Sequence, residues 1–320
     1  MINEVRNTVL SVLNKNNYGY ISPSDFNLYA ENAQMEIFED YFSNYNKAIN
    51  MENARMAGSD YAEIEGPIAE TMEAFLVSNF LYNSAISPSL PTSNYFLVPS
   101  VTTTGDTSYY ILKMLYHTKI IGSGTNSSVS AGSNLLISSS AQFTTLGIVN
   151  GDIVVNVDTS RTARVVSVLS DTTIVLDSNI FLTDPVNYLI ISKASKEAEK
   201  VSVGKITALN NSMLTSPTNI FPAYTLETRF IKAYPETINQ FGQVEAVYFR
   251  HPKPPKWTFI SLVNGEPVFD QSQSDYQDFE LPIEDNYRLV MKILQYCGVS
   301  IRENEVASFA MGQQNLQDQQ

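Results

Sequence analysis

The first eighty residues carry apolar positions at helical spacing. In the segment 2–16, apolar side chains recur every three or four residues, which predicts an amphipathic helix. Further helices are predicted over residues 26–50, where aromatic side chains occupy more than one face, and over residues 67–81. Ser22 and Pro23 mark the start of the long helix, because serine caps a first turn and proline fits the first helical position.

The middle of the chain changes to short runs rich in β-branched residues. A Gly/Ser/Asn-rich stretch, Gly122–Asn134, precedes them and is predicted to be a flexible linker. Turn signals such as Asn150 followed by Gly151 separate the runs, so we expect a small antiparallel barrel or sandwich. Its five predicted strands are residues 135–138, 152–157, 161–169, 172–177 and 188–192.

Helices and strands are both predicted outside this β-rich module. A helix is expected over residues 194–210, and a final helix is expected to begin at Leu281 and Pro282 and to end at Gly298, since glycine commonly follows a last helical turn. The strands predicted outside the module are residues 95–98, 109–116, 230–234, 244–250 and 259–263.

Together these elements predict an α+β fold. We expect a helical host domain with a small antiparallel β-barrel or sandwich insertion and a polar C-terminal tail. The host domain comprises residues 1–121 and 194–311, the insertion residues 122–193, and the tail residues 312–320. The tail lacks core-forming content, so it is expected to be disordered unless a partner orders it.

The composition is acidic overall, although charged residues are few. Only 17% of the residues are charged, and 20 basic against 33 acidic side chains give a formal net charge of −13. A protein that grips nucleic-acid phosphates needs clustered lysine and arginine, so the composition argues against that class. A negative channel wall, however, would let DNA slide without sticking. The uncharged polar surface fits an exterior covered by neighbouring subunits and, equally, a compositional bias of the source genome.

Residues with catalytic or metal-binding spacing are not found in the sequence. His117 and His251 lie in unrelated segments, and the carboxylates near residues 36–40 and 280–285 are explained by helix solvation and capping. Cys297 is the sole cysteine and is expected to be a buried thiol. We therefore expect a protein without catalytic, cofactor-binding or metal-binding residues. The sequence shows neither a leader nor a long apolar run, so we also expect a soluble protein made in a reducing cytoplasm.

Three segments resemble proteins of tailed bacteriophages. Residues 230–257 follow the pattern strand, YP-x-TI, strand, R-x-P-K-x-P-K-W, which resembles head–tail connector and ring proteins of the crAss-like phages. The stretch ISPSDFNLYAENAQMEIFEDYF, residues 21–42, is a second point of resemblance to the same family. FTTLGIVNGDIVVN, residues 143–156, with TARVVSVLSDTTIVLD, residues 162–177, resembles small β-barrel decorations of phage virion proteins. The resemblance covers most of the chain, and several ring proteins of one phage share its motifs.

This resemblance implies a structural protein of the virion, assembled in the bacterial cytoplasm and located at the portal vertex or tail neck. Such proteins form homo-oligomeric rings, usually of twelve copies, that contact the portal protein and other ring or tail proteins. Double-stranded DNA would pass through the ring without sequence-specific binding, and no membrane would be involved. The alternative is a tail-associated binding module that recognises a host surface glycan or another virion protein. An enzyme acting on the cell wall is a further alternative.

Interface residues are the candidate functional residues that follow from this interpretation. Trp257 follows a stiff proline run and could anchor a subunit interface, but its aromatic neighbours favour a place in the core. The long aromatic helix and the tail supply the others. The complete set of interface candidates is Trp257, Phe38, Tyr41, Phe42, Gln313, Gln314 and Leu316.

Overall fold

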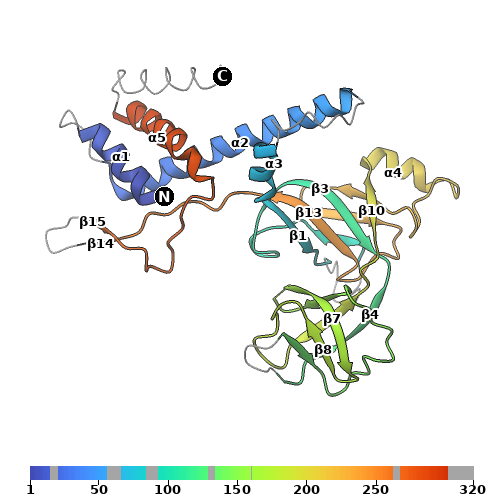
Figure 1. The fold of residues 1–320 in the computed structure, drawn as a ribbon. Helices are drawn as coiled ribbons and strands as arrows, with labels where there is room; N and C mark the ends of the chain where they lie inside the picture. Colours follow the sequence, from blue (N-terminus) through green and yellow to red (C-terminus); the bar gives the residue numbers. More distant parts are fainter. Residues whose placement is uncertain are drawn as a thin grey trace. The chain divides into compact units, whose positions relative to one another are not determined.

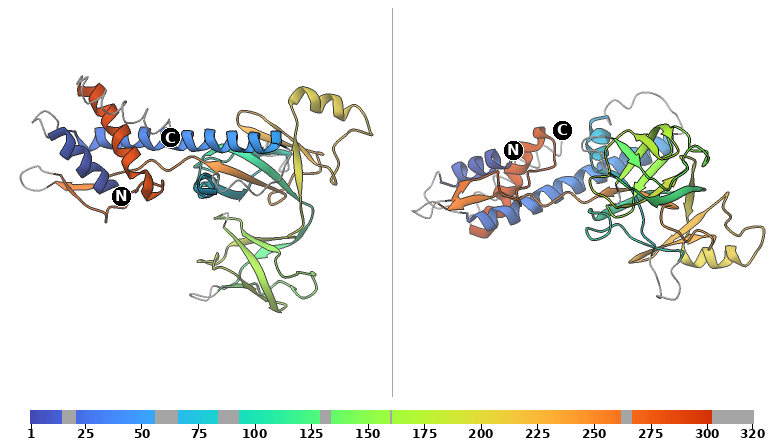
Figure 2. Two further views of the ribbon diagram at one scale, coloured as in Figure 1. Left: turned by 45° about the horizontal axis from the view of Figure 1, so that its top comes forward. Right: turned by 90° about the horizontal axis from the view of Figure 1, so that it is seen from below.

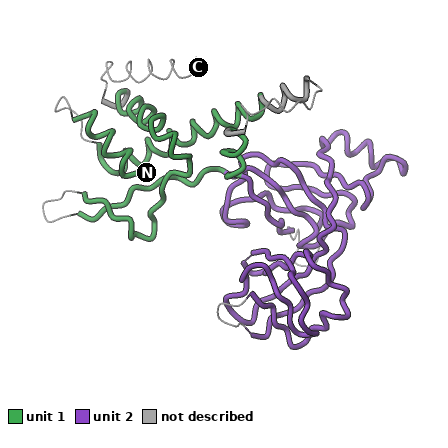
Figure 3. Tube along the Cα trace, in the orientation of Figure 1, with its two compact units in different colours: residues 1–75, 251–320 green, residues 76–250 purple. Residues whose placement is uncertain are grey.

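The computed structural model describes residues 1–14, 21–55, 66–83, 93–128, 134–159, 161–261 and 267–301. Within these residues the protein is a mixed α/β structure made mostly of strands (Figure 1). It divides into two compact units, residues 1–75 with 251–320 and residues 76–250 (Figure 3). None of the described helices combines the length and the apolar character needed to cross a membrane.

The first unit contains most of the helices. Its long helix begins as predicted, because the backbone N–H of Asp25 donates to Ser22 Oγ at 3.2 Å. The last helix, α5, packs against both α1 and α2 (Figure 2). The elements of this unit are α1 (Ile2–Asn14), α2 (Pro23–Arg55), α3 (Gly66–Glu73), β14 (Phe259–Ser261), β15 (Pro267–Phe269), the 3-10 helix η1 (Ile283–Asp285) and α5 (Asn286–Ile301).

The second unit contains a curled seven-stranded sheet of order β1-β13-β3-β10-β11-β12-β2. All neighbours are antiparallel except β10 and β11. A bridge between Asn83 and Phe96 joins the chain after β1 to β2, so the two ends of the strand order meet. Aromatic side chains such as Phe96 and Tyr248 fill the interior. The elements are β1 (Leu76–Phe80), β2 (Tyr95–Leu97), β3 (Ser108–His117), β10 (Ser195–Lys200), α4 (Val203–Asn210), β11 (Ala223–Leu226), β12 (Phe230–Tyr234) and β13 (Val244–Arg250).

The same unit holds a six-stranded antiparallel sheet of order β4-β9-β6-β7-β8-β5. A bridge between Ser128 and Ile137 joins the chain after β4 to β5, so this sheet also closes on itself. Phe143, Phe181 and Tyr188 are buried inside it. The strands are β4 (Ile120–Thr125), β5 (Leu135–Ile137), β6 (Ile153–Asn156), β7 (Thr162–Ser170), β8 (Thr173–Leu176) and β9 (Asn187–Ile191).

The structure does not confirm a helical host domain, because the described parts of residues 1–121 and 194–311 form both helices and strands. Strands β1 to β3 and β10 to β15 lie in those segments, and most of them build the seven-stranded sheet. The segment 194–210 was expected to be one helix, but it forms β10 and then α4. The segment 67–81 likewise gives a short helix followed by β1. Pairing with neighbouring strands outweighs the helical preference of these sequences.

Two glycine-based expectations are also wrong. Gly122 and Gly124 belong to β4 rather than to a linker, and a Cβ at Gly124 would lie 2.6 Å from the hydroxyl oxygen of Tyr188. Glycine therefore lets the Tyr188 ring lie close to β4, and a larger residue would require that ring to move. Gly298 does not end the last helix, because α5 continues to Ile301. The tail 312–320 lies outside the described residues.

Candidate functional site

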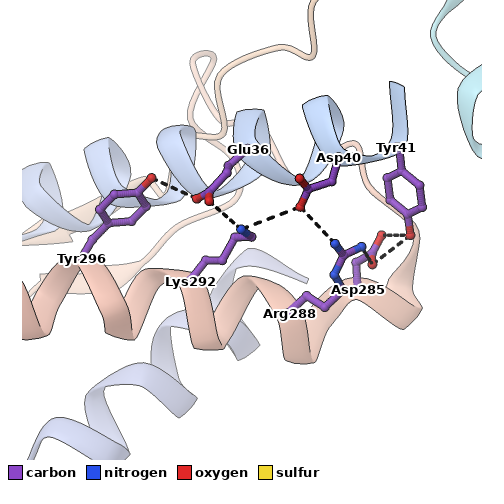
Figure 4. A network of polar contacts seen from close by, with 7 residues as sticks. All are labelled: Glu36, Asp40, Tyr41, Asp285, Arg288, Lys292 and Tyr296. Carbon is purple, nitrogen blue, oxygen red and sulfur yellow. Dashed lines mark hydrogen bonds and ion pairs between the residues drawn. The ribbon is translucent and has the colours of Figure 1, made fainter. Parts of the chain in front are cut away.

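A line of charged and tyrosine side chains joins α2 to the η1–α5 segment within the first unit (Figure 4). Three of its members share one face of α2, and four follow one another along η1 and α5 at spacings of three and four residues. The seven residues of this α2–α5 network are Glu36, Asp40, Tyr41, Asp285, Arg288, Lys292 and Tyr296.

Lys292 is the most deeply buried cation of the network. Its Nζ lies 2.7 Å from Glu36 Oε1 and 3.8 Å from Asp40 Oδ2, and only 4% of the side chain is exposed. The short contact is an ion pair whose angles do not meet hydrogen-bond geometry. Arg288 reaches Asp40 at 3.3 Å and Asp285 at 3.4 Å. Each cation therefore has two carboxylate partners, which favours one pairing of the two helices.

Tyr41 closes the network at one end. Its hydroxyl donates to the carboxylate of Asp285 at 2.8 Å and 3.0 Å. Burial, together with the adjacent Asp285, raises the pKa of Tyr41 to about 12. At the other end the Tyr296 hydroxyl donates to Glu36 Oε2 at 3.1 Å. The polar groups of the network are thus directed at one another, and the arrangement fits a clamp between helices rather than a reactive centre.

An acidic pocket of about 760 Å³ adjoins Tyr41 in the same unit. Glu70, Glu280 and Glu284 are among its lining residues, and the described lining includes no lysine or arginine. This pocket would repel phosphates and other anions. Among the described residues, no cluster of histidine, cysteine, aspartate or glutamate has metal-binding geometry.

An apolar groove of about 530 Å³ lies between α1 and α5, and we call it the α1–α5 groove. Val290, Met291 and Leu294 of α5 are buried beneath it, while Val12 of α1 and Tyr287 of α5 remain partly exposed at its sides. Glu284 is the one charged residue in its described lining. The groove therefore offers apolar surface for a partner that brings no charge.

A second apolar surface lies on the loop between α4 and β11, residues 211–222, which we call the apolar loop. Met213 and Leu214 are 99% and 98% exposed, and Ile220 and Phe221 are 61% and 77% exposed. Figure 1 shows α4 and this loop (yellow) at the outside of the seven-stranded sheet. Large apolar side chains grouped in this way mark interaction sites in soluble proteins.

The apolar loop is held in a defined conformation by its own hydrogen bonds. The backbone N–H of Ser216 donates to Ser212 O at 2.9 Å, and that of Thr218 donates to Phe221 O at 3.1 Å. The Thr237 hydroxyl, next to β12, donates to Asn219 Oδ1 at 3.0 Å. The exposed side chains are thus presented on an ordered backbone, which reduces the entropy that binding would cost.

His117 lies in a buried polar chain of the second unit. Its Nε2 is 2.7 Å from Glu245 Oε2 and its Nδ1 is 3.2 Å from Ser192 O, so both ring nitrogens face acceptors. Burial raises the pKa of Glu245, but hydrogen bonds from His117 and Ser78 outweigh burial and lower it. Ser78 donates to the carboxylate of Glu245 and not to the imidazole of His117. These three residues therefore lack the contact between a serine hydroxyl and a histidine ring that a serine hydrolase uses.

No protein-family model matches this chain, and no curated protein matches it. The sequence resemblance to phage connector proteins therefore stays a prediction, and the functional argument rests on the surfaces described above.

The structure places the predicted interface residues mainly inside the first unit. Trp257 is buried, its ring stacks near Phe259 and Phe269 at 5.6 and 6.0 Å, and the Arg6 guanidinium lies 3.8 Å from its centroid. This is the packing that the core interpretation expects. Phe38 is also fully buried.

The remaining interface candidates have different positions. Tyr41 belongs to the α2–α5 network, and Phe42 is half-buried. Gln313, Gln314 and Leu316 lie outside the described residues.

The two apolar surfaces were not predicted from the sequence. Residues 206–226, however, form a run without any charged side chain. That run contains the four exposed apolar residues of the apolar loop and was the available signal. The groove had no comparable signal, because Val12 and Val290 are nearly the whole chain apart in sequence.

Proposed function

We propose that this protein is a structural subunit of the ring assembly that links the portal to the tail of a tailed phage. The exposed apolar loop carries the proposal. Four large apolar side chains on an ordered loop mark an interaction site, and in a ring a neighbouring subunit would cover them. The sequence resemblance supplies the kind of assembly.

The acidic composition supports the same function. Twelve copies of a chain with a formal charge of −13 would surround DNA with negative charge, which disfavours adhesion of the phosphate backbone. In this proposal the ring provides a conduit for double-stranded DNA and a docking surface for the portal and for other tail proteins. It acts mechanically, without a cofactor.

Glycan recognition by the six-stranded sheet receives less support. Sugar-binding surfaces expose aromatic side chains, and Phe143, Phe181 and Tyr188 are the aromatic residues of the segment 120–193. All three are buried in the interior of that sheet. Recognition of another virion protein by this sheet remains compatible with its outer face.

Mass photometry of the purified chain, alone and mixed with the portal protein of the same phage, tests the proposed function. We expect closed rings of about a dozen copies, either from the chain alone or only when the portal is present. A monomer that neither assembles nor binds the portal at micromolar concentration would contradict the connector role. Binding to a glycan array by such a monomer would favour the alternative.

A further inference from the structure

We propose that the apolar loop of one copy docks into the α1–α5 groove of a second copy. This inference rests on the proposed function, because it names the contact that joins neighbours in the ring. The loop and the groove belong to different units of one chain, so a loop-in-groove contact pairs unlike surfaces. A contact of this kind is heterologous, and repeated contacts of this kind close into a ring when the rotation permits.

The two surfaces match in chemistry. The loop presents Met213, Leu214 and Phe221 without a charged residue nearby in sequence. The described lining of the groove is mainly apolar, with Thr8 and Asn286 as uncharged polar residues and Glu284 as its one charged residue. An uncharged contact also suits copies that each carry a net charge of −13, because charged contact surfaces of the same sign would oppose association.

The size of the surfaces is adequate for a specific interface. A volume of 530 Å³ accommodates several large side chains, and it falls within the roughly 300–1,000 Å³ of typical binding sites. An exposed aromatic side chain alone can bury on the order of 150–250 Å². Four large apolar side chains thus supply a substantial part of the about 800 Å² that each partner buries in a standard interface.

Two hydroxyl groups at these surfaces already have hydrogen-bond partners within the chain. Thr8, at the edge of the groove, already donates its hydroxyl to Glu4 O at 2.9 Å. In the loop, the Thr215 hydroxyl donates to Leu209 O at 3.1 Å. Docking therefore removes mainly apolar surface from water, which is the favourable part of association.

Two single variants with opposite defects test the contact. Leu214→Asp disables the loop but leaves the groove intact, whereas Val12→Asp disables the groove but leaves the loop intact. Both side chains are exposed, so neither change buries a charge within the monomer. Val101→Asp is the matched control, because Val101 is also an exposed valine outside both surfaces and the change adds the same charge.

Sedimentation velocity over a broad concentration range gives the readout. We expect the unmodified chain and Val101→Asp to associate beyond dimers, and each of the other two variants to associate at least about tenfold more weakly. An equimolar mixture of Leu214→Asp and Val12→Asp should form a one-to-one dimer and nothing larger. In that mixture only one intact loop meets one intact groove, and the mutated loop cannot enter the mutated groove.

Other outcomes overturn the inference. A chain that stays monomeric at all concentrations, with and without the portal protein, or a mixture that forms no dimer, shows that the loop binds a different partner. Full-sized assemblies from either single variant show that copies meet through other surfaces. The connector role is tested separately by portal binding: a monomer that still binds portal contradicts only this inference, and self-association without portal binding contradicts only the connector role.

Discussion

At the scale of single residues, burial raises the pKa of two side chains, Tyr41 and Cys297. By sequence Tyr41 is one of the aromatic residues that occupy more than one face of the long helix, and in the structure its hydroxyl donates to the carboxylate of Asp285. Cys297 is a thiol that the last helix turns fully inward. The buried thiol was predicted from its apolar surroundings in the sequence, but the partner of Tyr41 was not, because Asp285 lies 244 residues away along the chain.

Replacing Tyr41 by phenylalanine should weaken the first unit and change its response to alkali. At neutral pH we expect the free energy of unfolding to fall by about 1–2 kcal/mol, because Asp285 loses a donor. The pKa of Tyr41 is about 12 in the folded protein against 10.0 for an ordinary tyrosine. Between these values the unfolded chain releases a proton that the folded chain keeps, so the free energy of unfolding of the unmodified protein declines as pH rises.

In Tyr41→Phe the free energy of unfolding should fall less steeply as pH rises, because the titrating hydroxyl is missing. Urea unfolding followed by fluorescence of Trp257, which lies in the core of the first unit, measures the effect at pH 8 and pH 11. Tyr29→Phe is the control, since it removes a hydroxyl from the same helix. An equal pH dependence in all three proteins would show that Tyr41 does not carry it.

Cys297 should be unreactive in the folded protein. Burial raises the pKa of its thiol to about 12, so the reactive thiolate is scarce at pH 8. We expect negligible labelling by a disulfide reagent in native conditions and one thiol per chain in denaturant. Rapid native labelling would mean that α5 separates from its neighbours on the time scale of the assay.

At the scale of elements, the sequence predicts strands well where the residues have a strong preference for strands. It fails where pairing with neighbouring strands determines whether a segment becomes a strand. The strands at residues 230–234 and 244–250 were predicted with the bounds that the structure gives them. Ser195–Lys200, by contrast, reads SKEAEK, a composition typical of helices, yet it forms β10. It lies between β3 and β11, and that position between two partners cannot be deduced from its own residues.

Glu199→Pro tests the role of β10. The Glu199 N–H donates to Pro222 O at 2.9 Å at the start of the parallel pair with β11, and proline removes this donor. We expect the free energy of unfolding of the second unit to fall by roughly 2–3 kcal/mol. Glu199→Ala keeps the N–H and should behave as the unmodified chain does, apart from an exposed ion pair with Lys205. Urea unfolding followed by circular dichroism distinguishes the two variants, and equal stability would show that this bond matters little.

At the scale of the whole molecule, the two apolar surfaces come from segments that the sequence pattern treats as a connection or as helix faces. The groove forms only where α1 and α5 meet, and the loop belongs to a turn between α4 and β11. Secondary-structure patterns describe one segment at a time, so a surface composed of two distant segments is not contained in them.

Deleting residues Gln313–Gln320 should reduce docking to the portal or to the next ring without unfolding the protein. Apart from Leu316 these residues are polar and lack the apolar content of a core, so we expect the protein to remain folded without them. Pull-down with immobilised portal measures docking, and the thermal midpoint serves as the control for folding. Unchanged assembly after the deletion would exclude a docking role for the tail.

The division of the first unit between residues 1–75 and residues 251–320 has a consequence for synthesis on the ribosome. Residues 76–250 emerge as one uninterrupted segment and can fold as soon as they are made, since domains generally fold as units during synthesis. The helices α1 and α2 emerge first but must wait for α5, which supplies Lys292 and the far wall of the groove. A nascent chain therefore completes the apolar loop before it completes the α1–α5 groove.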